Sequence, residues 1–255
     1  MKIVILGSGN VANHFALRFD QLGYQIVQVY SRHKANAQAL ALRFNAIATD
    51  DLNTVDPLAD LYVIAVSDEA IPEVAAHLSN DINGIVVHTS GATDLSILQA
   101  FMHSGVLYPV QSISKNIETD FTQIPIGVEA SSTSTMESLW KIAKALSHRA
   151  FECNSKQRMA LHVSAVIVNN FSNILYQLSY EMMQDNNLSF ELLLPIIQET
   201  AKKVQNKQPI DGQTGPAIRN DNITINKHLN FLRENPPLQT IYQQLTLEIA
   251  KRRDK

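Results

Sequence analysis

Two glycines and an alanine at fixed spacing are the first residues of the chain whose types suggest chemistry. They lie in Gly7-Ser8-Gly9-Asn10-Val11-Ala12, directly after the apolar run from Lys2 to Leu6. Gly7 permits a tight turn, Gly9 lets the backbone approach a pyrophosphate, and Ala12 is small enough for a following helix to lie against a strand. The N–H groups at the start of that helix would face phosphate oxygens. The segment therefore predicts a dinucleotide-binding turn, and the alternative is an ordinary strand-to-helix connection.

The end of the next apolar run bears on which dinucleotide binds. Gln25 to Tyr30 is followed by Ser31-Arg32, about 20 residues after the glycine turn, where NAD enzymes carry Asp or Glu for the ribose hydroxyls. Neither residue is acidic. A hydroxyl followed by a guanidinium suits a 2′-phosphate, which Arg can grip with two charge-assisted hydrogen bonds. We therefore predict NADP(H) as the cofactor; the alternative is that Ser31 caps the next helix and Arg32 is solvated.

These residues need a strand, a turn, a helix and a second strand to position them, and the first half of the chain continues that alternation. Further strands are expected at residues 46–48, 61–66, 84–87, 105–110, 126–130 and 150–153, and helices at 35–44, 71–78, 95–103 and 131–146. Strands that alternate with helices predict an α/β fold with a doubly wound, mostly parallel sheet. Pro109 indicates an edge or a break in the ladder.

Polar residues at the ends of these strands extend the predicted site. In a doubly wound sheet the ligand lies outside the carboxyl ends of the strands, so Ala65, Val66 and Ser67 should border the nucleotide. Ser90, in the polar segment that follows the next strand, is expected to join them. His88, at the end of that strand, either donates a hydrogen bond near the nicotinamide or is a satisfied structural group.

A strand followed by a polar loop supplies another candidate pair. Ser112 and Lys115 lie in the loop after residues 105–110, and an ammonium beside hydroxyls can bind an anionic group of a substrate. The alternative is that Lys115 is a solvated loop lysine.

Composition changes near Asn154, where we place the boundary between domains 1–153 and 154–255. Helices are expected at 156–185, 189–205, 224–234 and 238–252, and no strand pattern occurs among them. Aromatic and Met side chains in the first of these helices fall at helical spacing, which is typical of a core or a dimer interface. The second domain is therefore predicted to be all-helical.

Charge and cysteine content bound the partners and the compartment. The net charge of −3 and the pI of about 6.2 argue against nucleic acid and against a polybasic membrane patch. The single cysteine, Cys153, excludes an internal disulfide and a Cys-rich metal site, so no metal is expected. A strand that begins at Lys2 leaves no room for a signal peptide, and no apolar run approaches the length of a membrane helix. We expect a cytoplasmic protein.

Several separated motifs together resemble a known family. The segments GSGNVA, YSR, AVSD, HTSG, YPVQSIS, VNNFSN and TGPAIRND, followed by His228, occur in order over nearly the whole chain. They resemble bacterial proteins in which a Rossmann-like domain precedes a helical domain named DUF2520, within a larger group similar to pyrroline-5-carboxylate reductase, 6-phosphogluconate dehydrogenase and F420-dependent NADP reductase. The resemblance implies a nicotinamide site in a cleft between the two domains and a homodimer formed through the helical domain.

The chain departs from the hydroxyacid dehydrogenases of that group at one position. Those relatives carry a catalytic Lys three residues before an Asn-Asn pair, but here Val166 precedes Asn169-Asn170 at that spacing. His162 lies seven residues before Asn169 and so on the same helical face. An imidazole there could transfer the proton, with Asn169 and Asn170 orienting the substrate. The alternative is that all three only tie the helix to the first domain.

The segment from Thr214 to Asp221 offers a similar choice. Gly215-Pro216 would form a turn and Asp221 would cap the next helix. Alternatively, Arg219 binds a substrate carboxylate while Asp221 orients a base, in this subunit's site or in that of a partner subunit.

The leading hypothesis from the sequence is an NADP(H)-dependent oxidoreductase acting on a small carbonyl, imine or alcohol substrate that can carry an anionic group. His162 is the preferred acid–base group, Asn169 and Asn170 the orienting groups, and Ser112, Lys115 and Arg219 possible substrate contacts. Two alternatives remain: an NADP(H)-binding sensor or partner protein without turnover, kept open by the missing Lys, and an F420-linked reductase, for which the sequence offers no specific sign.

Overall fold

The computed structural model describes residues 1–112 and 120–252, which form two compact units, Met1–Asn170 and Phe171–Lys255. The last strand ends at Glu152, beside the domain boundary expected near Asn154. The units themselves divide after Asn170. The helical segment 155–170 therefore packs with the sheet.

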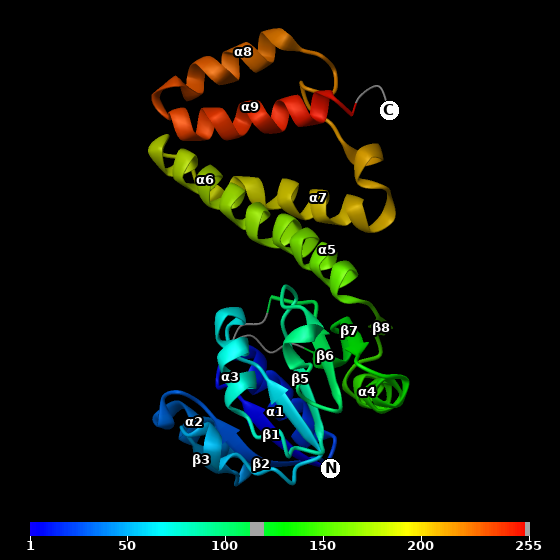
Figure 1. The fold of residues 1–255 in the computed structure, drawn as a ribbon. Helices are drawn as coiled ribbons and strands as arrows, with labels where there is room; N and C mark the ends of the chain where they lie inside the picture. The colour runs from blue at the N-terminus through cyan, green and yellow to red at the C-terminus, as the bar shows by residue number, and fades with distance from the viewer. Residues whose placement is uncertain (113–119, 253–255) are drawn as a thin grey trace. The chain divides into compact units, whose positions relative to one another are not determined.

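The first unit is built on one sheet (Figure 1), in the order β3-β2-β1-β4-β5-β6-β7-β8. Each pair of neighbouring strands is parallel except β6 and β7, which pair antiparallel. Their bounds are β1 Lys2–Leu6, β2 Gln25–Tyr30, β3 Ile47–Thr49, β4 Leu61–Ile64, β5 Ile85–His88, β6 Ser104–Pro109, β7 Ile126–Ala130 and β8 Ala150–Glu152. The predicted doubly wound, mostly parallel sheet is confirmed. Its strand order reverses direction between β1 and β4, which is the position where such sheets bind ligands.

Both faces of the sheet are covered, which explains why its strands read as continuous apolar runs. Ile3 and Ile5 of β1 pack with helices α1 (Asn10–Gln21), α2 (Lys34–Ala41) and α4 (Thr133–Leu146) on one face. Val4 and Leu6 pack with α3 (Ile71–His77) on the other. Successive side chains of a strand point to opposite faces, so a strand covered on both sides needs apolar residues at every position.

Two predicted elements differ from the structure. Residues 95–103 do not form a regular helix; only a 3₁₀ turn, Leu95–Leu98, is present, begun by the Asp94 carboxylate, which accepts a hydrogen bond from the Ser96 N–H. Leu98 and Phe101 are buried against the sheet, so the chain reaches β6 at Ser104 without room for further turns. Pro109 does not mark an edge strand, since it is the last residue of β6, which pairs on both sides.

The predicted long helix at 156–185 is divided into three parts. Helix α5 (Ser155–Ala165) leads into a π-helical turn, Val166–Phe171, and α6 (Ser172–Asp185) follows. A π-helical turn widens the helix by one residue and occurs often at functional sites. In this chain it contains both Asn169 and Asn170.

Among its described residues the second unit contains helices, connected by turns and loops, and no strand. After α6 come α7 (Leu194–Asn206), α8 (Asn222–Phe231) and α9 (Pro236–Ala250). None of these four helices contains a buried residue. Within the described chain, no helix is both long enough and apolar enough to cross a lipid bilayer.

Candidate functional site

A cavity of about 820 Å³ lies at the carboxyl ends of the parallel strands, and all of its lining residues belong to the first unit. This volume is typical of small-molecule and cofactor sites. Every predicted cofactor-binding residue lines it: Gly7, Ser8, Gly9, Asn10, Val11, Ser31, Arg32, Ala65, Val66, Ser67 and Ser90. Four of the five predicted catalytic residues line it as well: Ser112, His162, Asn169 and Asn170. The fifth, Lys115, lies outside the described residues.

The glycine turn between β1 and α1 forms one end of the cavity. Gly7 has φ +134°, and a Cβ there would lie 2.2 Å from the carbonyl oxygen of Ala65. A Cβ on Gly9 would meet nothing within 4 Å. The amide of Asn13 donates hydrogen bonds to the carbonyls of Ser8 (3.0 Å) and Gly9 (2.9 Å), which fixes the turn. The open space over Gly9, beside a helix start without acidic residues, fits a pyrophosphate.

The end of β2 offers groups suited to a 2′-phosphate. The hydroxyls of Ser8 and Ser31 lie 3.0 Å apart, and the exposed Arg32 makes no ion pair with any described residue. Ser31 does not cap the next helix, because the N-cap of α2 is His33. His33 and Asn36 also line the cavity and add two hydrogen-bonding side chains that were not predicted. The residues present therefore fit a dinucleotide that carries a 2′-phosphate, as NADP(H) does.

At the other end of the cavity His162 meets a side chain from the sheet. The Tyr108 hydroxyl on β6 lies 3.3 Å from Nδ1 of His162, and the two rings are in edge contact with centroids 6.1 Å apart. Gly91 lies against both, since a Cβ on it would be 2.7 Å from His162 Nδ1 and 2.8 Å from Tyr108 Cζ. Asn169 and Asn170 lie on the same wall through the π-helical turn. Proton-exchanging and hydrogen-bonding groups thus gather at one end of the cavity.

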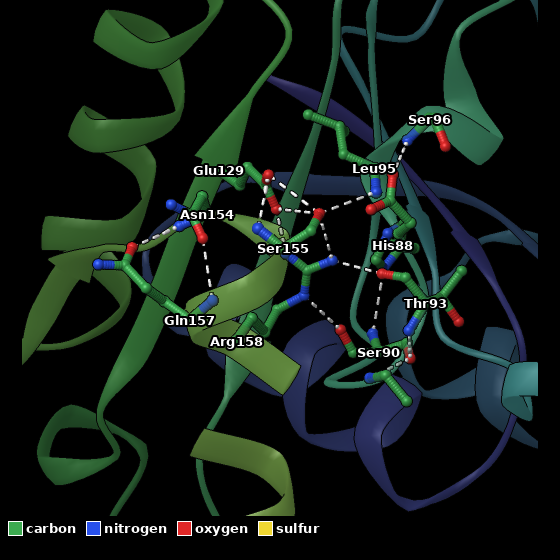
Figure 2. Close-up of polar contacts among 12 residues, drawn as sticks. His88, Ser90, Thr93, Leu95, Ser96, Glu129, Asn154, Ser155, Gln157 and Arg158 are labelled. Carbon is green, nitrogen blue, oxygen red and sulfur yellow. Dashed lines mark hydrogen bonds and ion pairs between the residues drawn. The ribbon is translucent and has the colours of Figure 1, made fainter. Parts of the chain in front are cut away.

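A buried ion pair holds α5 on the sheet (Figure 2). Arg158, whose side chain is 1% exposed, pairs with Glu129 of β7, and its Nε donates to the carbonyl of Ser90 at 3.1 Å. Its remaining nitrogen, Nη2, donates to both the carbonyl of Thr93 and the hydroxyl of Ser155. The Ser155 N–H donates to the Glu129 carboxylate at 2.8 Å. Because His162 lies one turn after Arg158, this network determines where the imidazole stands.

Neither predicted alternative for His88 holds in full, because the residue does not line the cavity and one of its ring nitrogens lacks a hydrogen-bond partner among the described residues. It is fully buried, does not line the cavity, and its Nδ1 accepts a hydrogen bond from the Ser90 N–H at 3.2 Å. Among the described residues its Nε2 has no hydrogen-bond partner. Burial, and after it the positive charge of Arg158, lowers the pKa of His88 to about 3. The imidazole is therefore neutral at physiological pH.

Asp221 and Arg219 belong to the second unit. Asp221 caps α8 as predicted, with one carboxylate oxygen accepting from the Thr224 N–H at 3.0 Å and the other from its hydroxyl at 2.7 Å. These hydrogen bonds lower the pKa of Asp221. Arg219 is exposed, and neither residue is among those that line the cavity. The substrate-binding alternative stays a prediction.

Tyr108 is the main residue of the site that the sequence patterns did not single out. The strand that contains Tyr108 was predicted. The pattern of residues in that strand, however, cannot predict that the Tyr108 ring contacts His162, which lies 54 residues later on a helix. A signal was present, since Tyr108 is a hydroxyl-bearing residue at the carboxyl end of a predicted strand, where ligands bind. No group of three or more His, Cys, Asp or Glu side chains arranged to hold a metal occurs in the described part of the chain.

Comparisons with known proteins agree with this geometry. Residues 2–90 match the family model described as NADP oxidoreductase, coenzyme F420-dependent, and residues 124–249 match the domain of unknown function DUF2520. A crystal structure described as a candidate NADP oxidoreductase, BF3122 from Bacteroides fragilis, has 39% sequence identity and a TM-score of 0.86, with 98% of each chain covered. No curated protein matches the chain.

More distant solved structures share the fold. A 1-pyrroline-5-carboxylate reductase from Streptococcus pyogenes has 12% identity and a TM-score of 0.66, with 98% of each chain covered. An imine reductase from Myxococcus stipitatus, solved with NADP⁺, has 13% identity and a TM-score of 0.67, covering 98% of this chain and 92% of that one.

Proposed function

Because this chain belongs to the NADP oxidoreductase family that joins an N-terminal coenzyme F420-dependent-type domain to DUF2520, we propose that it reduces or oxidises a small carbonyl, imine or alcohol with NADP(H). The predicted resemblance to this family is confirmed, and NADP(H) is the family's cofactor. The observation that carries the proposal is one cavity lined both by the glycine turn that follows β1 and by His162, Asn169 and Asn170.

The residues divide the work between binding and proton management. The cofactor supplies or accepts the hydride. The turn at Gly7 and Gly9 holds the pyrophosphate, and Ser31 and Arg32 bind the 2′-phosphate. Asn169 and Asn170 hydrogen-bond the substrate, and His162 belongs to the acid–base machinery that exchanges the proton of the substrate's oxygen or nitrogen.

The polar lining favours an enzyme over the alternative of a sensor that never turns over. A sensor could fill the space beside the nicotinamide with apolar side chains, whereas His162, Tyr108, Gln111, Asn169 and Asn170 all line this cavity. Residues on both sides of the expected domain boundary at 154 contribute to it. Turnover is therefore the better account of the cavity.

A homodimer is part of the proposal. Helices α6 to α9 contain no buried residue, yet they carry exposed large apolar side chains such as Ile174, Tyr180, Ile196 and Leu245. A helix with so much exposed apolar surface gains free energy when a partner covers it. A second copy of the chain, packed against these helices, is the occupant that we propose.

Cofactor binding is tested by thermal shift and by substitution of Arg32. A ligand at 100 times its Kd stabilises the native state by about 2.7 kcal/mol, so NADPH should shift Tm more than NADH at equal concentration. Arg32→Ala should weaken NADPH binding about 10- to 100-fold, the value of a charge-assisted hydrogen bond, and leave NADH unchanged. Arg149→Ala is the matched control, because Arg149 is exposed and does not line the cavity.

Turnover is tested with the same protein. NADPH oxidation is followed against panels of ketones, aldehydes, oxoacids and imines, and NADP⁺ reduction against the corresponding alcohols and amines. Wild-type turnover that His162→Ala lowers by at least about 100-fold supports the assigned role. Binding of NADPH without turnover of any substrate in these panels contradicts the proposed reaction and favours the sensor.

A further inference from the structure

Tyr108 and His162 come from different elements and meet at the wall of the cavity. Tyr108 stands at the end of β6 and is 7% exposed, whereas His162 lies on α5 and is half-buried. Both line the cavity, and the phenol oxygen lies 3.3 Å from the imidazole Nδ1. Two side chains that can exchange protons are thus held within hydrogen-bond reach of each other beside the proposed substrate.

The surroundings of the pair are built for this contact. Gly91 follows β5, and any side chain at this position would overlap both rings. The two rings can approach each other because residue 91 is a glycine. The Arg158 network fixes α5 one turn before His162 and also grips the carbonyl of Ser90, the residue before Gly91. The same anchor therefore positions the imidazole and the loop beneath it.

The phenol of Tyr108 keeps its proton at physiological pH. Burial, and after it the negative charge of Asp68, raises the pKa of the Tyr108 hydroxyl above its ordinary value. A neutral phenol is a hydrogen-bond donor to a carbonyl oxygen or an imine nitrogen. The imidazole beside it has one nitrogen that donates and one that accepts, so it can replace the proton that the phenol loses.

We propose that Tyr108 is the catalytic acid that protonates the substrate, and that His162 is its proton relay. This inference rests on the proposed function. During reduction the carbonyl or imine carbon accepts the hydride with its electron pair, the phenol O–H bond breaks, and a new O–H or N–H bond forms on the substrate. His162 returns a proton to the phenolate and regains one from water. In oxidation the same bonds form and break in reverse.

The test compares Tyr108→Phe, which keeps the ring and removes only the hydroxyl, with Tyr24→Phe, the same change outside the cavity. Loss of a general acid costs about 10²- to 10⁴-fold in kcat. We expect that loss for Tyr108→Phe with KM and NADPH affinity within about threefold, and no change for Tyr24→Phe. The double variant Tyr108→Phe/His162→Ala should be no slower than the worse single variant, because residues that act as a unit are not additive.

Each other outcome overturns a distinct statement. A wild-type enzyme that turns over while Tyr108→Phe keeps its kcat within about threefold removes Tyr108 from the mechanism and leaves the proposed function intact. A kcat loss accompanied by equal losses of NADPH affinity and Tm assigns Tyr108 a structural role only. No turnover by the wild type, with NADPH bound normally, overturns the proposed function and this inference with it.

Discussion

Gly7 and Gly9 stand two residues apart in the same turn, yet their neighbours constrain them differently. Gly7 has a positive φ and lies against the carbonyl of Ala65, whereas Gly9 has φ −75° and faces open space. The close contact explains why the fold requires glycine at position 7, whereas at position 9 we propose that glycine leaves room for the ligand. The two roles predict opposite outcomes for the same substitution.

We expect Gly9→Ala to change the free energy of unfolding of the unliganded protein by less than about 1 kcal/mol, since a methyl group there meets no atom. In the proposed site the methyl group would take the space of the pyrophosphate, so NADPH affinity should fall at least about tenfold. Gly7→Ala should destabilise the protein by about 3 kcal/mol or more. Chemical denaturation and NADPH titration check both; an unchanged NADPH Kd for Gly9→Ala would remove the turn from the cofactor site.

Because His88 is buried as a neutral imidazole, we expect the free energy of unfolding of the protein to fall in acid. Its pKa is about 3 in the folded state and about 6.5 in the unfolded chain, so between these values only the unfolded chain binds the proton. The contribution of neutral His88 to the free energy of unfolding is fully present above pH 6.5 and is lost as the pH falls toward 3, by roughly 1 kcal/mol per pH unit. Urea denaturation at pH 7.5, 6.0 and 5.0 should show this slope in the wild type and a shallower one in His88→Gln. Equal slopes would mean that His88 is not neutral in the fold.

At the scale of elements, the Arg158–Glu129 pair is what attaches α5 to the sheet. Removing one partner of a buried pair leaves the other charge unpaired and costs about 3–5 kcal/mol. We therefore expect Glu129→Gln to destabilise the first unit by about that amount, because Arg158 is 1% exposed. The matched control is Glu199→Gln, which breaks the exposed Glu199–Lys203 pair and should cost less than about 0.5 kcal/mol. Similar effects of the two substitutions in denaturant melts would contradict the anchoring role.

The π-helical turn is the second feature at this scale. Because the π-helical turn accommodates one extra residue, an unbroken α-helix through Val166–Phe171 would present every later residue about 100° away, around the helix axis, from its observed direction. Two adjacent asparagines line the cavity in the structure. The turn thus couples a local backbone irregularity to the presentation of Asn169 and Asn170.

For the whole molecule, the exposed apolar helices predict the assembly. Light scattering after gel filtration should give a mass of twice 28.4 kDa. Ile174→Glu, on α6, places a charge on the proposed interface and should weaken the dimer at least about tenfold. Leu42→Glu, equally apolar and more exposed but in the first unit, should leave the mass unchanged. A wild-type mass of 28.4 kDa at micromolar concentration would contradict the homodimer.

The sequence alone determined the sheet, the glycine turn and the cofactor class. Each is encoded by residues that are neighbours in the chain: a strand covered on both faces needs an unbroken apolar run, and the turn needs its glycines at fixed spacing. The eleven residues predicted to bind the cofactor, from Gly7 to Ser90, all line the observed cavity. Local rules sufficed because the strands of such a sheet bring their carboxyl ends to one edge.

Only the tertiary structure decided how the reactive end of the cavity is put together. Tyr108, His162 and Gly91 come from three separate segments. Their contact depends on the register of β6 beside β5 and on the position of α5, which the buried Arg158 fixes against the sheet. No spacing in the chain encodes such distances, since they follow from the packing of side chains far apart in sequence. The sequence could therefore name His162 as a candidate acid–base group, and the fold placed the phenol of Tyr108 beside it.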